Sequence, residues 1–214
     1  DERELNETVT QLKNQVEENI PYIREMITRD FVYGNINGIY NEQIEAIGME
    51  TRGMYSVVVI QLKESENQDI ETNCMAMYDI KNCLGDSYAA DIRICSFLQS
   101  RTSMAAIVYL DGANDGTGAL EELLNTLGSF KNYVNNTLGY EVLICSGGVS
   151  NDLSEASELY ANAEYTLKTN IYNMENNIIL AEGQECTDYV QEYDIFKIKE
   201  ELTEMLSSES FDVL

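Results

Sequence analysis

The run YSVVVIQLK, residues 55–63, is the feature that most constrains how this chain can fold. Its nearly continuous β-branched residues leave no polar face, which is typical of a buried strand at the centre of a sheet. Such a strand must pair with neighbouring strands, and both faces of the sheet around it must be shielded from solvent. The rest of the chain therefore has to supply further strands that pair with it and helices that pack on the sheet.

Four further apolar runs predict those partner strands. Residues 91–99 alternate in polarity and residues 103–111 follow after a short turn, so these two runs are predicted to form a hairpin. Residues 140–148 and 176–182 are predicted as the last two strands. Helical spacing of apolar residues appears between the runs, at residues 65–85, 119–139 and 152–168. The order β-α-β-β-α-β with an extra α-β predicts an α+β fold of the ferredoxin-like type, an antiparallel sheet with helices on one face.

The N-terminal region has a different pattern. Leu5, Val9, Leu12 and Val16 are spaced 4-3-4, which is the spacing of a heptad seam. A helix that packs on its own domain and a parallel coiled coil between two copies both remain open, and we favour the coiled coil because the stripe is narrow. Pro21 marks either a kink or a new helix start.

The stretch CSGGVSNDLSEAS, residues 145–157, raises the question of a nucleotide site, because a Gly-rich turn before a helix can bind phosphate. The spacings of the known phosphate-binding loops are absent, and no Lys or Arg lies nearby to neutralise an anion. We therefore interpret Gly147 and Gly148 as a tight turn between a strand and a helix. Asp152 and Glu155 are predicted to form a capping box at the start of that helix.

The charge and composition of the chain exclude several classes of function. Lys and Arg number 13 against 38 Asp and Glu, a net charge of −25, which repels a nucleic-acid backbone. His is absent, which excludes Ser-His-Asp and Cys-His catalysis. No run reaches the ~18 apolar residues of a membrane span, and no signal-peptide pattern is present. The five cysteines form no C-x-x-C pair, so we expect reduced thiols and a cytoplasmic location.

Over residues 55–182 the order of elements resembles the GGDEF domains of diguanylate cyclases. The strongest similarity follows the strand 140–148, where the family has an S-x-G-[IV]-[AS] turn and a helix with an A-[DE]-x-A-L core. The corresponding residues here are Ser146, Gly148, Val149, Ser150, Ala163, Glu164, Thr166 and Leu167. The resemblance implies a palm like that of nucleotidyl cyclases.

The parts that carry cyclase chemistry do not match that family. Its hairpin turn binds the guanine nucleotide and metal through glycines and an acidic residue, but residues 99–103 of this chain contain neither. Its first strand ends in an aspartate that holds Mg²⁺, where this chain has Gln61, Leu62 and Lys63. Because two-metal phosphoryl transfer needs carboxylates at both places, we expect a degenerate domain without catalytic residues, metal or cofactor.

A second resemblance, over residues 20–214, is to AraC-type bacterial transcriptional regulators that carry a degenerate GGDEF-like domain. It rests on the segment IPYIREMITRDFVYGNI, in which Ile23, Arg24, Met26 and Phe31 follow the family pattern and Thr28 and Val32 depart from it. Such regulators include two-component response regulators and membrane-anchored sensors. The resemblance implies a sensor or receiver upstream and DNA-binding helix-turn-helix units after Leu214, so we expect this chain to be part of a longer protein.

These observations predict three parts: an N-terminal signalling helix of coiled-coil character (residues 1–33), a degenerate GGDEF-like domain (residues 34–185) and a C-terminal linker helix (residues 186–214). We expect a non-catalytic module that forms a homodimer through residues 1–33 and relays a signal to a DNA-binding domain outside this chain. We expect no contact of this chain itself with DNA or a membrane.

Two other hypotheses remain. In one, the chain is a sensor that binds a nucleotide or small molecule in the vestigial cleft between the first strand and the hairpin, through Lys63 and Arg101. In the other, it is an active cyclase with a divergent site, which the missing carboxylates disfavour.

Overall fold

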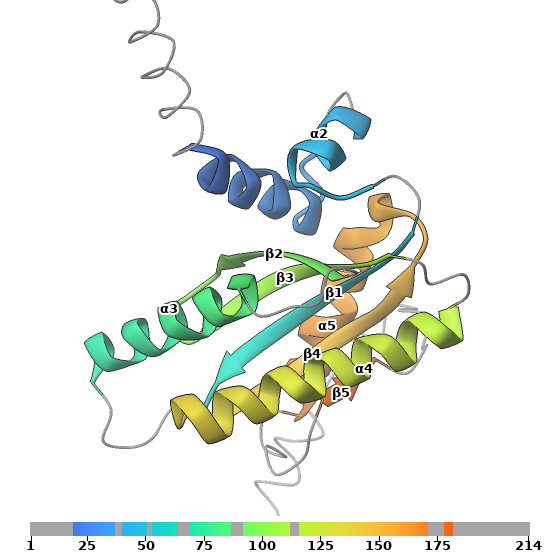
Figure 1. Ribbon diagram of the computed structural model, residues 1–214. Coiled ribbons are helices and arrows are strands. Elements are labelled where there is room, and N and C mark those ends of the chain that lie inside the picture. Colours follow the sequence, from blue (N-terminus) through green and yellow to red (C-terminus); the bar gives the residue numbers. More distant parts are fainter. Residues whose placement is uncertain are drawn as a thin grey trace, which may run out of the picture. The chain divides into compact units, whose positions relative to one another are not determined.

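The computed structural model describes residues 19–36, 40–50, 53–63, 69–86, 92–111, 116–170 and 178–181, all within one compact unit. Residues 19–32 are helical. The elements that follow are α2 (Tyr40–Ala46), β1 (Met54–Leu62), α3 (Ile70–Asp86), β2 (Ile92–Leu98), β3 (Ser103–Leu110), α4 (Gly116–Tyr133), β4 (Val142–Ser150), α5 (Ala156–Asn170) and β5 (Ile178–Leu180) (Figure 1). The fold is α+β, as predicted. The predictions for residues 1–18 and 186–214 lie outside the described residues.

The five strands form one sheet in the order β2-β3-β1-β4-β5. The predicted central strand, β1, pairs antiparallel with β3 and β4, and Ile60 lies opposite Met104 and Ile144. The predicted hairpin of β2 and β3 is present. However, β5 pairs with β4 in parallel, with Ile178 opposite Ile144, so the sheet is mixed rather than antiparallel. The reason is that α5 crosses over and returns the chain in the direction of β4.

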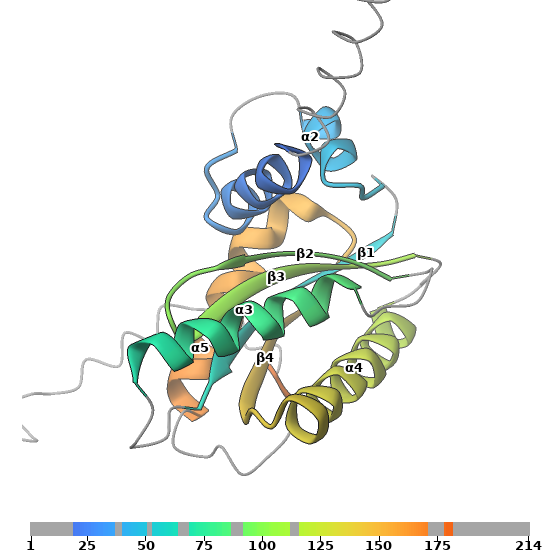
Figure 2. The same ribbon diagram turned by 60° about the vertical axis from the view of Figure 1, so that its left-hand side comes forward.

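Helices cover both faces of the sheet (Figures 1 and 2). The helices α3 and α4 pack on the face that carries Val58 and Ile60. The helical segment 19–32, α2 and α5 pack on the opposite face, which carries Tyr55 and Val57. The prediction of helices on one face was therefore wrong, because the helix before β1 and the extra helix before β5 take the second face. This double cover also explains why the run from Tyr55 to Ile60 is buried at every position.

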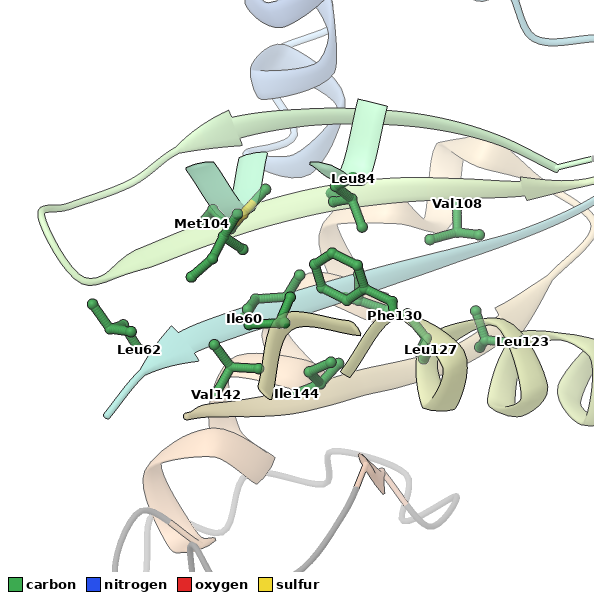
Figure 3. Packing of buried hydrophobic residues seen from close by; sticks show 14 of the residues in the cluster. Ile60, Leu62, Leu84, Met104, Val108, Leu123, Leu127, Phe130, Val142 and Ile144 are labelled. Carbon is green, nitrogen blue, oxygen red and sulfur yellow. The ribbon is translucent and has the colours of Figure 1, made fainter. Parts of the chain in front are cut away.

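The larger apolar core lies between the sheet and the helices α3 and α4 (Figure 3). Ile60 and Met104, from neighbouring strands, share this core with Leu84 of α3 and with Leu127 and Phe130 of α4. These side chains come from distant parts of the sequence, and the alternation of the strands directs them to the same face.

The helical segment 19–32 packs on the sheet along one side only. Thr28, Phe31 and Val32 are buried, and the Thr28 hydroxyl donates a hydrogen bond to the carbonyl oxygen of Arg24 at 2.7 Å. Ile23 and Met26 remain 40% and 48% exposed. The end of this helix therefore packs on the chain's own domain, which is one of the two alternatives that the sequence left open. The other alternative, a coiled coil between two copies, stays a prediction.

Candidate functional site

Three parts of the chain meet at the end of β1, where the sequence placed the vestigial cleft. The backbone N–H of Leu62 donates to the carbonyl oxygen of Thr102 in the hairpin turn at 2.7 Å. The N–H of Lys63 donates to the carbonyl oxygen of Glu141, just before β4, at 2.9 Å. The turn that carries Arg101 and the start of β4 therefore flank the end of β1, and the two predicted site residues lie at the same end of the sheet.

Lys63 is engaged in an ion pair that the sequence did not predict. Its Nζ lies 2.7 Å from Oε2 of Glu141, and both side chains are well exposed. The hydrogen bond from Lys63, followed by its charge, lowers the pKa of the Glu141 carboxyl. An exposed pair of this kind contributes little to stability. The pair matters more for the binding of a cation, because the Glu141 carboxylate beside the end of β1 already has a cationic partner in Lys63.

The hairpin turn is closed by its own side chains. The hydroxyl groups of Ser100 and Ser103 lie 2.8 Å apart, and the N–H of Thr102 donates to the Ser100 hydroxyl at 3.2 Å. Arg101 at the tip is exposed and forms no ion pair with any residue that the structure describes. The turn thus presents one guanidinium group to solvent.

Gly147 and Gly148 lie inside β4 and form a β-bulge, which corrects the predicted turn. Ser56 of β1 lies opposite Val149 and Val58 lies opposite Ser146, so that two residues of β4 face one of β1. A Cβ at Gly147 would lie 1.7 Å from the backbone oxygen of Leu159 in α5. The glycine is therefore required by the close approach of a helix to the sheet, a structural role rather than a phosphate cradle.

The predicted capping box is present in a modified form that runs through Ser150. The Asp152 carboxylate accepts a hydrogen bond from the N–H of Ser154 at 2.8 Å, as a helix cap does. The N–H of Asp152 donates to the Ser150 hydroxyl at 3.0 Å, and this hydroxyl donates to the Glu155 carboxylate. The last residue of β4 thus replaces the direct contact between Asp152 and Glu155.

A cluster of aromatic residues joins the N-terminal helix to β2 and α5. The ring of Tyr33 packs edge-on against the rings of Phe97 and Tyr160, with 5.6 Å between ring centroids in each pair. Gln99 donates to the Tyr160 hydroxyl at 2.6 Å, and the guanidinium of Arg29 lies 5.2 Å from the centroid of the Phe97 ring. Burial raises the pKa of Tyr160 to about 12, so this hydroxyl keeps its proton at neutral pH.

The carbonyl groups of the last residue of α2 and of the two residues after it form a second joint on the same face. Arg24 donates from Nε to the carbonyl oxygen of Ala46 at 3.4 Å, Cys95 donates from Sγ to that of Ile47 at 3.2 Å, and Arg93 donates to that of Gly48. Arginine side chains at the end of a helix satisfy carbonyl groups that have no helical partner. These three bonds tie the segment after α2 to both the N-terminal helix and β2.

Neither joint was predicted from the sequence. More than sixty residues separate Tyr33 from Phe97, and more than sixty separate Phe97 from Tyr160. In the sequence, Arg24 and Arg93 look like ordinary surface charges. Only Arg24 carried a signal, because the resemblance to AraC-type regulators included it. Within the described ranges, no three Asp, Glu or Cys side chains gather as metal ligands would. No helix in those ranges has the length and apolar composition needed to cross a membrane.

Neither a family model nor a curated protein sequence matches this chain.

Proposed function

We propose that this chain is a non-catalytic regulatory module of an AraC-type transcriptional regulator, with a degenerate GGDEF-like domain. The observation that carries the proposal is the position of the N-terminal helix. Phe31 and Val32 share one buried cluster with Val57 and Ile107 of the sheet and with Leu159 of α5. A shift or rotation of the upstream helix therefore acts directly on the domain core, which is what a relay requires.

The end of β1 supports the non-catalytic part of the proposal. A cyclase needs a free carboxylate there to hold Mg²⁺, but the acidic side chain that the structure describes at this place, Glu141, is paired with Lys63 at 2.7 Å. The hairpin turn contributes Arg101 and hydroxyl groups that bind one another. This arrangement favours neither metal binding nor phosphoryl transfer.

In the proposed mechanism, a signal from an upstream sensor or receiver changes the geometry of the helix that ends at residue 32. The two joints, at Tyr33 and at the carbonyl groups after α2, transmit this change to β2 and α5. The C-terminal region passes it to a DNA-binding domain outside this chain. The protein works in the cytoplasm as a homodimer, and DNA contact belongs to that other domain.

The relay is tested in the full-length regulator with a transcriptional reporter. Arg24→Ala removes the bond from the N-terminal helix to the Ala46 carbonyl, and we expect it to alter the ratio of induced to basal output while the protein level stays unchanged. Met75→Ala, which truncates an exposed side chain of α3, is the control and should leave the ratio unaltered. Equal ratios in wild type and Arg24→Ala would contradict the relay.

The lack of catalysis is tested with GTP and Mg²⁺ or Mn²⁺ on the purified chain, with an active diguanylate cyclase as a positive control. We expect no product above the level of a reaction without protein. Turnover that is lost in Lys63→Ala would establish an enzyme with a divergent site and overturn this part of the proposal.

The exposed guanidinium of Arg101 favours a second candidate, a sensor for an anionic ligand such as a guanine nucleotide at the end of β1. Its test is equilibrium dialysis with GTP and GDP. A sensor predicts saturable binding that Arg101→Ala weakens and Lys168→Ala does not. Absence of saturable binding would remove this candidate and leave the mechanical relay.

A further inference from the structure

The strand β2 lies at an edge of the sheet, with a helix on each of its faces. The sheet order places it last, and no strand among the described residues pairs with its other side. On one face, Ile92, Ile94 and Leu98 pack against the core that contains α3. On the other face, Arg29 of the N-terminal helix lies 5.2 Å from the centroid of the Phe97 ring. Figures 1 and 2 show β2 between these two helices.

An ion pair joins the two helices around that edge. Nζ of Lys81 in α3 lies 2.6 Å from Oε2 of Glu25 in the N-terminal helix, and only 22% of the lysine and 28% of the glutamate side chain are exposed. Side chains cannot pass through the hydrogen-bonded ladder of β2 and β3. Arg29, which lies 3.6 Å from the same carboxylate and over Phe97, places Glu25 beside the strand rather than beyond its ends. The pair therefore crosses the free edge of β2.

The backbone groups at this edge are those that β3 leaves unbonded. The N–H of Gln99 donates to the carbonyl oxygen of Ser103 at 3.0 Å. The alternation of an antiparallel ladder then directs the N–H and C=O of Phe97 to β3, and those of Ser96 and Leu98 to the free edge. A row of unpaired backbone groups invites pairing with another extended segment, and folded proteins block such edges by covering them.

We propose that the Glu25–Lys81 pair is a strap that closes the free edge of β2 and fastens the N-terminal helix to α3 on the opposite face of the sheet. While the strap is closed, an extended segment cannot add to this edge. A displacement of the N-terminal helix pulls Glu25 away from Lys81 and opens the edge. The strap goes beyond the proposed function, which routes the signal to β2 and α5, because it carries movement of the N-terminal helix to the other face of the sheet.

The charges around Glu25 allow the strap to open and close. The carboxylate divides its two oxygens, with Oε2 on Lys81 at 2.6 Å and Oε1 on Arg29 at 3.6 Å. When Lys81 leaves, Arg29 on the same helix still neutralises the carboxylate. Opening therefore leaves no unpaired charge against the sheet, which keeps its free-energy cost low. The released ammonium group of Lys81 enters water at the end of its flexible side chain.

Cys95 reports whether the N-terminal helix is in place. Its half-buried thiol packs in the cluster beneath that helix and donates to the carbonyl oxygen of Ile47 at 3.2 Å. The test is the rate at which iodoacetamide alkylates Cys95 in the purified, reduced chain, followed by peptide mass spectrometry. We expect Lys81→Gln to raise this rate about fivefold, which corresponds to about 1 kcal/mol. Loss of a nearby cation by itself slows alkylation, because it disfavours the thiolate, so a rise reports exposure of the thiol.

Three comparisons isolate the strap. Lys63→Gln removes an exposed Lys–Glu pair at the end of β1 and, as the matched control, should leave the rate at Cys95 unchanged. Lys81→Arg keeps a cation that can reach Glu25 and should keep the wild-type rate. Cys145 is fully buried in the same chain, so its alkylation reports unfolding of the whole domain and should not rise in any variant.

A wild-type rate at Cys95 in Lys81→Gln would overturn the strap. An equal rise at Cys95 and Cys145 would also overturn it, because the pair would then stabilise the whole fold instead of holding one helix. Equal rates in Lys81→Gln and Lys81→Arg would show that the charge has no part in it. All of these rates are measured on the purified chain without a signal or DNA, so the strap stands or fails separately from the proposed function.

Discussion

Gly147 determines how closely α5 can approach the sheet. A methyl group at this position would lie 1.7 Å from the backbone oxygen of Leu159, and a helix backbone cannot move aside as a flexible side chain can. We expect Gly147→Ala to lower the free energy of unfolding by roughly 2–3 kcal/mol, measured by urea titration. Gly128→Ala in α4 is the control, because among the described residues its Cβ would meet Ile178 alone, at an ordinary contact distance of 3.9 Å. Equal stability of the two variants would show that the close approach is not present in solution.

Cys145 couples stability to pH. Burial raises the pKa of its thiol from 9.0 to about 12. The unfolded chain loses this proton near pH 9 while the folded chain keeps it, so the stabilisation is complete below pH 9 and is lost as pH rises towards 12. Between pH 8 and pH 10, in reducing buffer, we expect wild type to lose about 1 kcal/mol more stability than Cys145→Val. Tyrosines with raised pKa values act in the same direction in both proteins, so the difference isolates the thiol. Parallel pH profiles of the two proteins would contradict this assignment.

At the scale of elements, the side chain of Arg93 ties the segment after α2 to β2. Arg93 donates to the carbonyl oxygen of Gly48, approaches Glu50 at 3.5 Å and lies 5.7 Å from the centroid of the Tyr109 ring. A lysine has one donor group at the end of a flexible chain and cannot make these contacts together. We expect Arg93→Lys to cost about 1 kcal/mol of unfolding free energy in a urea titration.

The matched control for this substitution is Lys168→Arg on α5. It exchanges the same two residue types at an exposed ion pair with Glu164, where either side chain can reach the carboxylate. We expect no change in stability for the control. If Arg93→Lys were as stable as its control, the planar guanidinium would have no special role at this joint.

At the scale of the whole molecule, the N-terminal helix should unfold together with the sheet. Phe31 is buried in the cluster that joins this helix to β1, β3 and α5, so Phe31→Ala is expected to cost about 3–5 kcal/mol. Ile23→Ala, on the exposed side of the same helix, should cost far less. The chain has no Trp, so unfolding is followed by far-UV circular dichroism and by the near-UV signal of tyrosine.

In both of these variants the two signals should change together in a single transition. An early loss of helical signal, before the tyrosine signal changes, would show that the helix detaches separately. A relay through a rigid joint would then lack its physical basis.

Part of the fold follows from local pattern alone. The β-branched run at residues 55–63 identified the central strand, and the short connection between residues 99 and 103 identified the hairpin of β2 and β3. These features depend on side-chain alternation and turn length over a few residues, which the sequence displays directly. Lys63 and Arg101, which the sequence placed in one candidate site, do lie at the same end of the sheet, and their role in binding stays a prediction.

Other features are not visible in any local pattern. The pairing of Lys63 with Glu141 joins residues 78 positions apart, and the aromatic cluster of Tyr33, Phe97 and Tyr160 draws on three separate elements. The residue pattern of a short strand is the same whether its neighbour runs parallel or antiparallel. The sequence therefore did not reveal that β5 runs parallel to β4.

The sequence by itself determined which segments become strands and helices, and that β1 lies at the centre. The tertiary structure decided which face each helix covers, why Gly147 must lack a side chain, and which side of the N-terminal helix stays open. The physical reason is that periodicity records how apolar each side of an element is. What packs against that side depends on long-range contacts that form only when the whole core is assembled.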